Sequence, residues 1–421
     1  MEFTKSGGNR KPVTIAVVGA GLRGSAYARL AVASGLGRIV AVAEPDPTRR
    51  AAFAASHRPA SVFTGWESLA AAGRLADVAV IATQDRLHVE PAVALARQGY
   101  HLLLEKPMAP TEPEARQIAD AVTAAGVIGA VCHVLRYTDY TRRLKALLDD
   151  GRIGTLVSVQ HLEPVGWWHQ AHSFVRGNWR RAADSGPMLL TKSCHDLDWL
   201  AYLIGATPRS VASFGGLAHF RPEHRPAGAS DRCVSCAVEP SCPYSAVRLY
   251  TRCLDDGEDW PLNAVTPSRT RSSMLLALQD GPYGRCVYSC DNDVVDHQVV
   301  ALQYDTGVTA TFTMTAFTPM QRRQTRLFGS HGSIDGDGRH LHVTDFRTGH
   351  TETIDTHGSG GHAGAGHDGG DAGLVEAFLA AVAAADPSLL SSDMATSLAS
   401  HRVVWAAEHA RTTGTVVTVS S

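Results

Sequence analysis

Three glycines near the start of the chain, Gly19, Gly21 and Gly24, have a spacing suited to holding a phosphate group. They follow the apolar run 13–18, which predicts a buried parallel strand, and precede a small-residue helix over 25–33. In that context Gly19 permits a tight turn, Gly21 lets backbone approach a pyrophosphate, and Gly24 permits close helix–strand packing. The helix N-terminus adds unpaired N–H groups and a positive dipole. The segment therefore predicts a dinucleotide site.

An acidic residue at the end of the next strand indicates which dinucleotide binds. Glu44 closes the run RIVAVAE about 20 residues after Gly24, where a carboxylate accepts hydrogen bonds from ribose hydroxyls. The same carboxylate repels the 2′-phosphate of NADP. Arg49 and Arg50 lie just beyond and could reach such a phosphate. We expect NAD as the cofactor, with NADP the less favoured alternative.

A cysteine cluster lies in the middle of the chain, at Cys233, Cys236, Cys242 and Cys253. A C-x2-C pair followed by two more thiols could supply the four thiolates of a tetrahedral zinc site. Four protein ligands leave no open position for substrate, so such a zinc would be structural. Separate buried thiols and disulfides are the alternatives.

The segment 167–180 combines three tryptophans with histidine, arginine and asparagine side chains. Indole faces stack on the apolar face of a sugar ring, and polar groups read its hydroxyls. An aromatic loop packed under a domain interface is the alternative. The expected substrate contacts are Trp168, His169, His172, Arg176, Asn178 and Trp179, joined by His133, Arg136 and Tyr137 at the end of the last parallel strand.

The elements that position these residues change character near residue 150. Before it, apolar strands at 78–83, 101–107 and 127–137 alternate with helical patterns, which predicts a doubly wound parallel sheet. Beyond it, longer β-rich segments joined by short turns predict a largely antiparallel sheet with few helices, near 192–205, 374–385 and 393–411.

The expected fold is therefore α/β, with an N-terminal Rossmann doubly wound parallel sheet and a C-terminal α+β domain whose large, mostly antiparallel sheet has one open face. We place the NAD-binding domain at 1–135 and the domain for substrate binding and oligomerisation at 136–421. The second domain carries a cysteine-rich insert at about 228–256. Terminal helices at 373–412 could pack back toward the first domain.

Composition narrows the class of protein. The formal net charge of −2 gives no electrostatic reason to expect nucleic acid or an anionic membrane as partner. No uninterrupted apolar run approaches the roughly 20 residues that span a bilayer. The first residues, MEFTKSGGNRKP, lack the apolar core of a signal peptide. We expect a cytoplasmic protein.

Three further motifs carry a family resemblance. Glu105-Lys106-Pro107 follows the strand HLLL, the stretch TQDRLH (83–88) closes the strand before it, and CHDLD (194–198) lies on a later helix. In this order and spacing they resemble the Gfo/Idh/MocA oxidoreductases over almost the whole chain. That resemblance implies a Rossmann domain, an open-faced sheet domain, a tightly held nicotinamide cofactor, and a sugar or cyclitol substrate.

The resemblance also implies roles for individual residues. Similar glycine-rich stretches recur at the pocket rim, so His367 and Asp371 could touch substrate. The expected cofactor contacts are Gly19, Gly21, Leu22, Arg23, Gly24, Glu44, Thr83, His88, Glu105 and Lys106.

Lys106 and His195 are the expected catalytic residues. Lys106 ends a parallel strand, over the crevice in which such sheets bind ligands, and the family uses this lysine in catalysis. A lysine desolvated beside a nicotinamide can exchange a proton with a substrate hydroxyl. Histidine titrates near neutrality, so His195 suits the same transfer.

The chain departs from the family pattern at residue 191. Related sugar dehydrogenases often carry an aspartate four residues before the histidine, whereas this chain has Thr191. Lys192 lies three residues from His195 and could share its helical face. It is a third catalytic candidate, either as the substitute base or as a group that holds an anionic substrate.

The leading functional hypothesis is an NAD-dependent oxidoreductase acting on a secondary hydroxyl or ketone of a sugar, glycoside or cyclitol. One alternative is a redox-neutral enzyme that cleaves or epimerises a glycoside through a keto-sugar. Another is an inactive, cofactor-bound sensor or scaffold. The threonine-rich strand 308–317 further predicts a homodimer or homotetramer built through the open sheet face.

Overall fold

The first part of the chain alternates strands and helices, as its apolar spacing predicts. The computed structural model describes residues 11–357 and 367–419, which divide into two units. Unit 1 comprises the described residues 11–142 and 367–398. Unit 2 comprises 143–357 and 399–419. No helix among the described residues combines the length and apolarity needed to span a bilayer.

Unit 1 is built on a parallel sheet of six strands in the order β3-β2-β1-β4-β5-β6. Because every pairing in it is parallel, all carboxyl ends of the strands meet at one edge. The strands are β1 (Val13–Val18), β2 (Gly37–Ala43), β3 (Ser61–Phe63), β4 (Val78–Ile81), β5 (His101–Leu104) and β6 (Gly129–Val131). The helices are α1 (Leu22–Ala33), α2 (Pro47–His57), α3 (Trp66–Ala71), α4 (Val89–Arg97), α5 (Glu112–Ala125) and α13 (Gly370–Ala384).

Helix α13 belongs to the core of unit 1 although it comes from the far end of the sequence. Its Leu374, Val375 and Phe378 are buried in one cluster with Val17 of β1 and Tyr27 of α1. The last predicted strand is shorter than expected, because β6 stops at Val131 and a short 3₁₀-helix, Val134–Tyr137, follows it.

Unit 2 is built on a nine-stranded sheet in the order β14-β13-β12-β11-β7-β10-β9-β8-β15. Only β7 and β10 pair in parallel. The strands are β7 (Leu156–Pro164), β8 (Pro208–Gly216), β9 (His297–Tyr304), β10 (Thr309–Thr315), β11 (Gln324–Gly329), β12 (Gly332–Gly336), β13 (His340–Asp345), β14 (Thr351–Asp355) and β15 (Val417–Thr418). The predicted fold class is confirmed.

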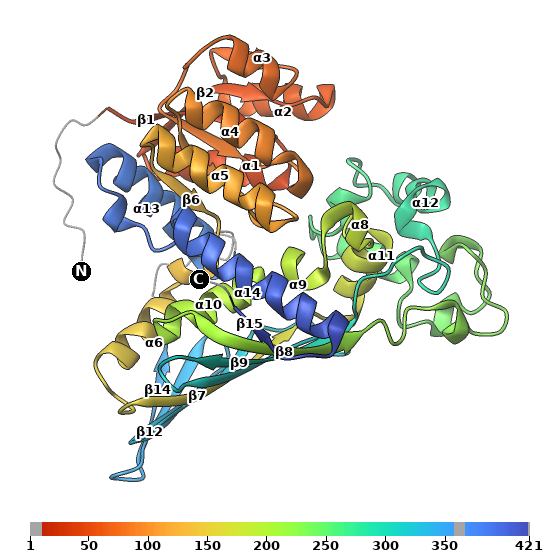
Figure 1. The fold of residues 1–421 in the computed structure, drawn as a ribbon. Coiled ribbons are helices and arrows are strands. Elements are labelled where there is room, and N and C mark those ends of the chain that lie inside the picture. The colour runs from red at the N-terminus through yellow and green to blue at the C-terminus, as the bar shows by residue number, and fades with distance from the viewer. Residues whose placement is uncertain (1–10, 358–366, 420–421) are drawn as a thin grey trace. The chain divides into compact units, whose positions relative to one another are not determined.

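The helices outside the two sheets are α6 (Asp139–Asp149), α7 (Trp167–His169), α8 (Ala182–Ser185), α9 (Met188–Thr191), α10 (Cys194–Ile204), α11 (Ala246–Asp255), α12 (Arg271–Asp280) and α14 (Met394–Thr413). A π-helical stretch, Gln170–Arg176, continues α7. Helix α10 covers one face of the large sheet, because its Trp199 stacks on His161 of β7 at 4.7 Å. Figure 1 shows α10 and α14 beside this sheet.

The opposite face of the sheet is open. Side chains alternate along β9, with Val300 and Leu302 buried and Val299 exposed. Phe214 of β8, which pairs directly with Val299, is 67% exposed.

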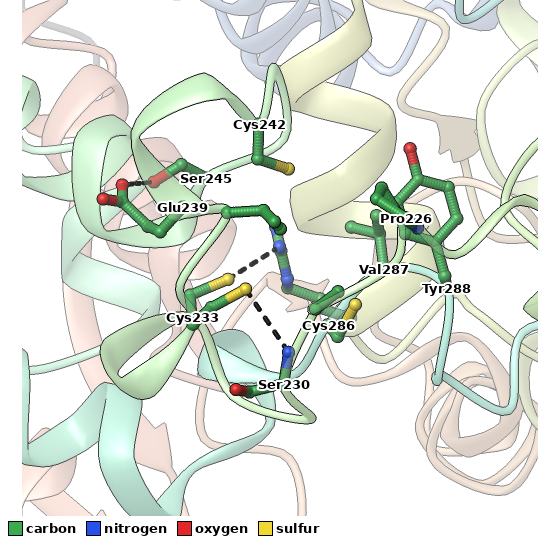
Figure 2. Close-up of a pocket in the computed structure, with 13 residues that line it drawn as sticks. Pro226, Ser230, Cys233, Glu239, Cys242, Ser245, Cys286, Val287 and Tyr288 are labelled. Atoms are coloured by element: carbon green, nitrogen blue, oxygen red, sulfur yellow. Dashed lines mark hydrogen bonds between the residues drawn. The ribbon is translucent and has the colours of Figure 1, made fainter.

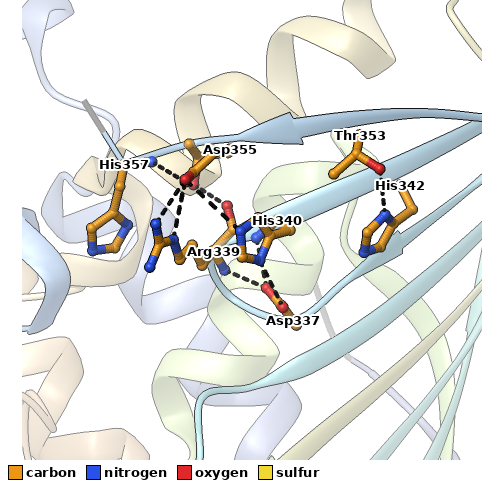
Figure 3. Close-up of polar contacts among 8 residues, drawn as sticks. Asp337, Arg339, His340, His342, Thr353, Asp355 and His357 are labelled. Atoms are coloured by element: carbon orange, nitrogen blue, oxygen red, sulfur yellow. Dashed lines mark hydrogen bonds and ion pairs between the residues drawn. The ribbon is translucent and has the colours of Figure 1, made fainter. Parts of the chain in front are cut away.

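The β13–β14 hairpin ends the sheet with polar cross-strand pairs (Figure 3). Arg339 forms an ion pair with Asp355 at 2.8 Å. The ring of His340 interacts with Asp337, and the ring of His342 interacts with the Thr353 hydroxyl. Charged and polar side chains of this kind discourage an edge strand from pairing with another chain.

Candidate active site

The glycine loop of unit 1 is shaped by steric limits that differ among its three glycines. A Cβ on Gly19, whose φ is +90°, would lie 2.6 Å from the Ala82 carbonyl oxygen. A Cβ on Gly24 would lie 1.9 Å from the Gly19 carbonyl oxygen. Gly21, by contrast, has no atom within 4 Å of such a Cβ. Gly21 is the N-cap of α1, so the open space lies where the helix presents its first N–H groups.

The Glu44 carboxylate lies beside this loop and is only 3% exposed. Its Oε2 accepts the Ala20 N–H at 2.8 Å, and its Oε1 accepts the Asp46 N–H at 2.9 Å. Arg49 forms an ion pair with Oε1 at 3.0 Å. Because each carboxylate oxygen can accept more than one hydrogen bond, Glu44 keeps acceptor capacity for ribose hydroxyls.

A charge network centred on the half-buried Arg23 links the glycine loop to Glu105, the residue that precedes Lys106. Arg23 Nε contacts Glu105 Oε1 at 2.5 Å, and Arg23 Nη2 contacts Asp371 Oδ1 of α13 at 2.6 Å. Arg23 and Glu105 both also contact the Tyr27 hydroxyl. Burial would raise the pKa of Glu105, but the positive charges of Arg23 and Lys106 lower it below its usual value. Asp371, which the resemblance placed at the pocket rim, is buried and paired with Arg23.

The turn that carries Lys106 is fixed on both sides. The Lys106 N–H donates to Glu105 Oε2 at 2.7 Å. The ring of His88, fully buried, reaches the Pro107 carbonyl at 2.9 Å and the Thr83 carbonyl at 3.2 Å. His88 and Glu105, expected to contact cofactor, therefore position the lysine turn.

Three predicted substrate contacts just after β6, His133, Arg136 and Tyr137, lie in unit 1. The Tyr137 hydroxyl hydrogen-bonds with Ser392 Oγ at 2.9 Å, and Arg136 donates to the Ser391 carbonyl. His133, the first of the three, is fully buried. Arg136 and Tyr137 thus tie the 391–392 segment to the end of the parallel sheet.

In unit 2 the chain breaks its helix just before His195. Helix α9 ends at Thr191, Ser193 has non-helical angles (φ −113°, ψ 12°), and α10 begins at Cys194. Lys192 and His195 are therefore not on one continuous helix, and the helix predicted to begin near residue 192 begins at Cys194 instead.

Lys192 instead takes part in a network of ion pairs. Its Nζ lies 3.1 Å from Glu163 Oε1 at the end of β7, and Arg323 Nη2 lies 3.0 Å from Glu163 Oε2. Arg323 Nε also contacts Asp196 Oδ1 at 2.5 Å, and His161 Nε2 contacts the same oxygen at 3.0 Å. Burial would raise the pKa of Asp196, but Arg323 and His161 hold it well below the usual range. His195 itself is buried at 5% exposure on the first turn of α10.

The aromatic segment turns partly toward the cysteine-bearing insert. His172 Nδ1 hydrogen-bonds with the Tyr250 hydroxyl at 2.7 Å, and its ring stacks on Tyr283 at 4.7 Å. Burial, with the charge of Arg176, lowers the pKa of His172 to about 3. Arg176 is 1% exposed and donates to the backbone carbonyls of Arg285 and of Tyr244 in the insert. Both side chains are committed to protein contacts.

The other residues predicted in that segment remain at least partly accessible. Trp168 and His169 pack against Trp260, at ring distances of 5.3 Å and 5.0 Å. Trp179 stacks on Phe174 at 6.0 Å, and Asn178 is exposed. The side chain of His367 lies outside the described residues.

The cysteines do not form the predicted zinc site. All eight are free thiols, which also removes the disulfide alternative. Cys233, Cys236, Cys242 and Cys286 line one pocket (Figure 2), whereas Cys253 is absent from its lining and is buried in an apolar cluster that also contains Cys233. Nowhere in the described part of the chain do three or more His, Cys, Asp or Glu side chains gather so that they could hold a metal ion.

Comparison with known families identifies this arrangement. A model described as "Oxidoreductase family, NAD-binding Rossmann fold" matches residues 13–133, and its companion, "Oxidoreductase family, C-terminal alpha/beta domain", matches 145–367. The chain belongs to the Gfo/Idh/MocA family. The resemblance drawn from the three motifs is confirmed.

Relatives within the Gfo/Idh/MocA family are distant. The 2,7-anhydro-N-acetylneuraminate hydratase of Escherichia coli is 26% identical over 49% of this chain and 53% of its own length. YteT of Bacillus subtilis, described as an oxidoreductase, is 26% identical over 63% of this chain and 61% of its own length. The chain thus spans less than two thirds of these relatives.

Two solved structures share the fold of this chain over nearly its full length. A levoglucosan dehydrogenase in complex with NADH and levoglucosan has a TM-score of 0.74 at 18% identity, covering 98% of this chain and 100% of that one. An Agrobacterium radiobacter oxidoreductase in complex with NAD⁺, L-tartaric acid and magnesium has a TM-score of 0.72 at 15% identity, covering 97% of this chain and 99% of that one.

One charged neighbour of the candidate residue Lys192 was not predicted from the sequence. Thr191 supplies no carboxylate, but Glu163, distant in sequence, places one 3.1 Å from the neighbouring Lys192. The sequence signal for Glu163 is weak: it is a charged residue at a position where the alternation of side chains along β7 predicts a buried one.

Proposed function

We propose that this protein is an NAD-dependent oxidoreductase that acts on a secondary hydroxyl, or the corresponding ketone, of a sugar, glycoside or cyclitol. The observation that carries the proposal is the fixed Lys106 turn, held by Glu105 and His88 at the carboxyl end of β5 in a domain of the NAD-binding family. Levoglucosan dehydrogenase and the hydratase named above support a carbohydrate-like substrate class.

NAD would be held by the glycine loop and Glu44. The space beside Gly21 and the uncapped start of α1 fit a pyrophosphate, and Glu44 fits the ribose hydroxyls. When bound, the nicotinamide supplies the hydride acceptor or donor. Glu44 disfavours the 2′-phosphate of NADP, and Arg49, already paired with Glu44, is the group that could offset this preference.

The chain's own residues would manage the proton. Removing hydride from a secondary alcohol requires the hydroxyl proton to leave, and we assign Lys106 and His195 to accept it. Lys192, held by Glu163, is the third candidate for proton transfer or for contact with an anionic substrate group. Trp168, His169, Asn178 and Trp179 are the side chains we propose for sugar recognition.

A redox-neutral reaction is the second candidate, and the similarity to a hydratase favours it. Oxidation at one sugar carbon acidifies the proton on the neighbouring carbon, so elimination or epimerisation can follow before the hydride returns. Product formation without added NAD and without net cofactor reduction would select this reaction over simple dehydrogenation.

The test is a substrate panel of sugars, cyclitols and anhydrosugars, assayed for both net NAD reduction and product formation. Lys106→Ala removes the assigned proton-transfer group, and Lys145→Ala is the matched control because Lys145 pairs with Asp149 on α6. Activity lost only in Lys106→Ala supports the proposal. Cofactor binding without activity on any member would favour the sensor alternative.

We also propose that the open sheet face joins subunits into a homodimer or homotetramer. Phe214 and Val299 are neighbours on adjacent strands and both are exposed, at 67% and 41%. A pair of exposed apolar side chains beside threonines suits an interface. Light scattering should give a dimer or larger for the wild type and a smaller species for Phe214→Asp; a wild-type monomer would contradict this.

A further inference from the structure

The first turn of α1 contributes an arginine whose guanidinium is held by two carboxylates from distant parts of the chain. Arg23 Nη1 and Nη2 donate to the two oxygens of Asp371, at 3.0 Å and 2.6 Å, and Arg23 Nε donates to Glu105 Oε1 at 2.5 Å. Paired hydrogen bonds of this kind fix the orientation of a guanidinium as well as its position. All three nitrogens of Arg23 therefore contact acids of unit 1.

An arginine at this place would ordinarily bind the cofactor. Arg23 lies two residues after Gly21, the N-cap of α1 and the place assigned to the pyrophosphate, and a guanidinium matches phosphate oxygens well. Its Nη2 also contacts the Tyr27 hydroxyl, however, so four of its five N–H groups have protein partners. Arg23 is therefore committed to the two acids and the tyrosine.

Glu105 transmits this arrangement to the turn that carries Lys106. Its Oε1 accepts from Arg23 and, at 2.7 Å, from the Tyr27 hydroxyl. Its Oε2 accepts the Lys106 N–H at 2.7 Å. Because the two oxygens belong to one planar carboxylate, fixing Oε1 also fixes the acceptor of the lysine N–H. Glu105 is 6% exposed, so water has little access to replace these contacts.

Helix α13 brings Asp371 to this network through a close approach to the segment after β6. A Cβ on Gly370 would lie 2.4 Å from the Val134 carbonyl oxygen, and a Cβ on Gly373 would lie 2.7 Å from the Tyr137 carbonyl oxygen. A side chain at either glycine would push the first turn of α13 away. Asp371 lies between the two glycines and is 1% exposed, so backbone packing sets its position.

We propose that Asp371 is a positioning residue: by holding Arg23 against Glu105, it fixes the turn that carries the proton-transfer lysine. The inference rests on the proposed function, in which Lys106 accepts the substrate proton. Proton transfer requires the two groups to lie within hydrogen-bond reach, so a displaced turn slows the chemical step. NAD affinity depends instead on the glycine loop and Glu44, so loss of Asp371 should lower kcat without weakening NAD binding.

The first test compares two α13 variants on the member of the substrate panel that is turned over fastest. Asp371→Asn keeps the size of the side chain but removes the charge that holds the guanidinium, so kcat should fall at least about tenfold while NAD affinity is not weakened. Glu376→Gln is the matched control, because Glu376 is exposed on the same helix.

A double variant separates positioning from a general structural role. In a Lys106→Ala background, Asp371→Asn should add little further loss, because the residue through which it acts has been removed. A loss of the same factor in both backgrounds would overturn the proposal.

The second test needs no substrate, because the Lys106 N–H is itself bonded to Glu105. Residue-resolved hydrogen exchange of the full chain with NAD should show the Lys106 amide exchanging at least about tenfold faster in Asp371→Asn than in wild type or Glu376→Gln. Unchanged exchange of the β1 amides shows that the variant is folded. Unchanged exchange at Lys106 in a folded Asp371→Asn would overturn the proposal.

Arg23→Lys provides the same test if Asp371→Asn does not fold. A lysine keeps the positive charge but has no planar fork with which to hold both acids, so the Lys106 amide should again exchange faster. The two proposals fail separately. Wild-type turnover in Lys106→Ala would contradict the proposed function. Low turnover in Lys106→Ala, with wild-type turnover and exchange in Asp371→Asn, would contradict only the positioning role.

Discussion

Gly21 and Gly24 offer a paired test of the dinucleotide site, because the same added methyl meets different surroundings at each. At Gly21 it meets no atom within 4 Å, and the backbone angles (φ −70°, ψ −164°) are allowed for alanine. Alanine is a poorer N-cap than glycine, but it also restricts the unfolded chain. We therefore expect Gly21→Ala to change the free energy of unfolding by no more than about 1 kcal/mol.

The methyl of Gly21→Ala would occupy the space assigned to the pyrophosphate. NAD affinity should fall at least about tenfold, which corresponds to ~1.4 kcal/mol. Gly24→Ala places its methyl 1.9 Å from a backbone oxygen that cannot rotate away, so it should lose about 3 kcal/mol or more of stability. Urea unfolding of cofactor-free protein and fluorescence titration with NADH measure the two quantities. Wild-type NADH affinity in a folded Gly21→Ala would refute the assigned phosphate position.

Three further predictions concern Lys192, His172 and Arg49. Lys192→Ala should lower kcat and kcat/KM together. Glu163→Gln should lower both more weakly, because it weakens the ion pair that holds the Lys192 side chain. A rise in KM alone would assign Lys192 to substrate binding. His172 is neutral in the folded protein, where its pKa is about 3, whereas in the unfolded chain it takes up a proton near pH 6.5. Because only the unfolded state gains this proton, the free energy of unfolding should fall by about 2 kcal/mol from about pH 6.5 to about pH 5. His172→Phe should flatten that acid slope in urea titrations, and an unchanged slope would contradict the assignment. Arg49→Ala should weaken NADP while leaving NAD binding nearly unchanged, and equal losses for both cofactors in parallel titrations would show that Arg49 does not contact the 2′-phosphate.

Local patterns in the sequence predicted the elements well. The glycine loop follows a strand and opens a helix, and the helix predicted near 192–205 ends where Gly205 forms the left-handed C-cap of α10, with φ 74°. Such features depend on a few adjacent residues, whose conformational limits are visible in the sequence.

Contacts between distant segments were not predictable in the same way. Arg23 pairs with Asp371 across 348 positions, and Glu163 pairs with Lys192 from a different strand. Cys286 lies more than 40 residues from the other cysteines of the pocket, yet it lines that pocket, whereas the predicted Cys253 does not. In each case the partner is selected by tertiary packing, which residue spacing along the chain does not encode.

Rapid mixing of NAD-loaded protein with the substrate panel tests most directly whether hydride is transferred to NAD with the assistance of Lys106. The absorbance of reduced nicotinamide, followed over one turnover, detects both lasting reduction and the transient reduction of a redox-neutral reaction. We predict a signal with at least one sugar, cyclitol or anhydrosugar, and a rate about 10²–10⁴-fold lower in Lys106→Ala at similar NAD affinity. A signal of wild-type rate in Lys106→Ala would contradict the assigned role of Lys106, and the absence of a signal with any substrate would contradict the proposed hydride transfer.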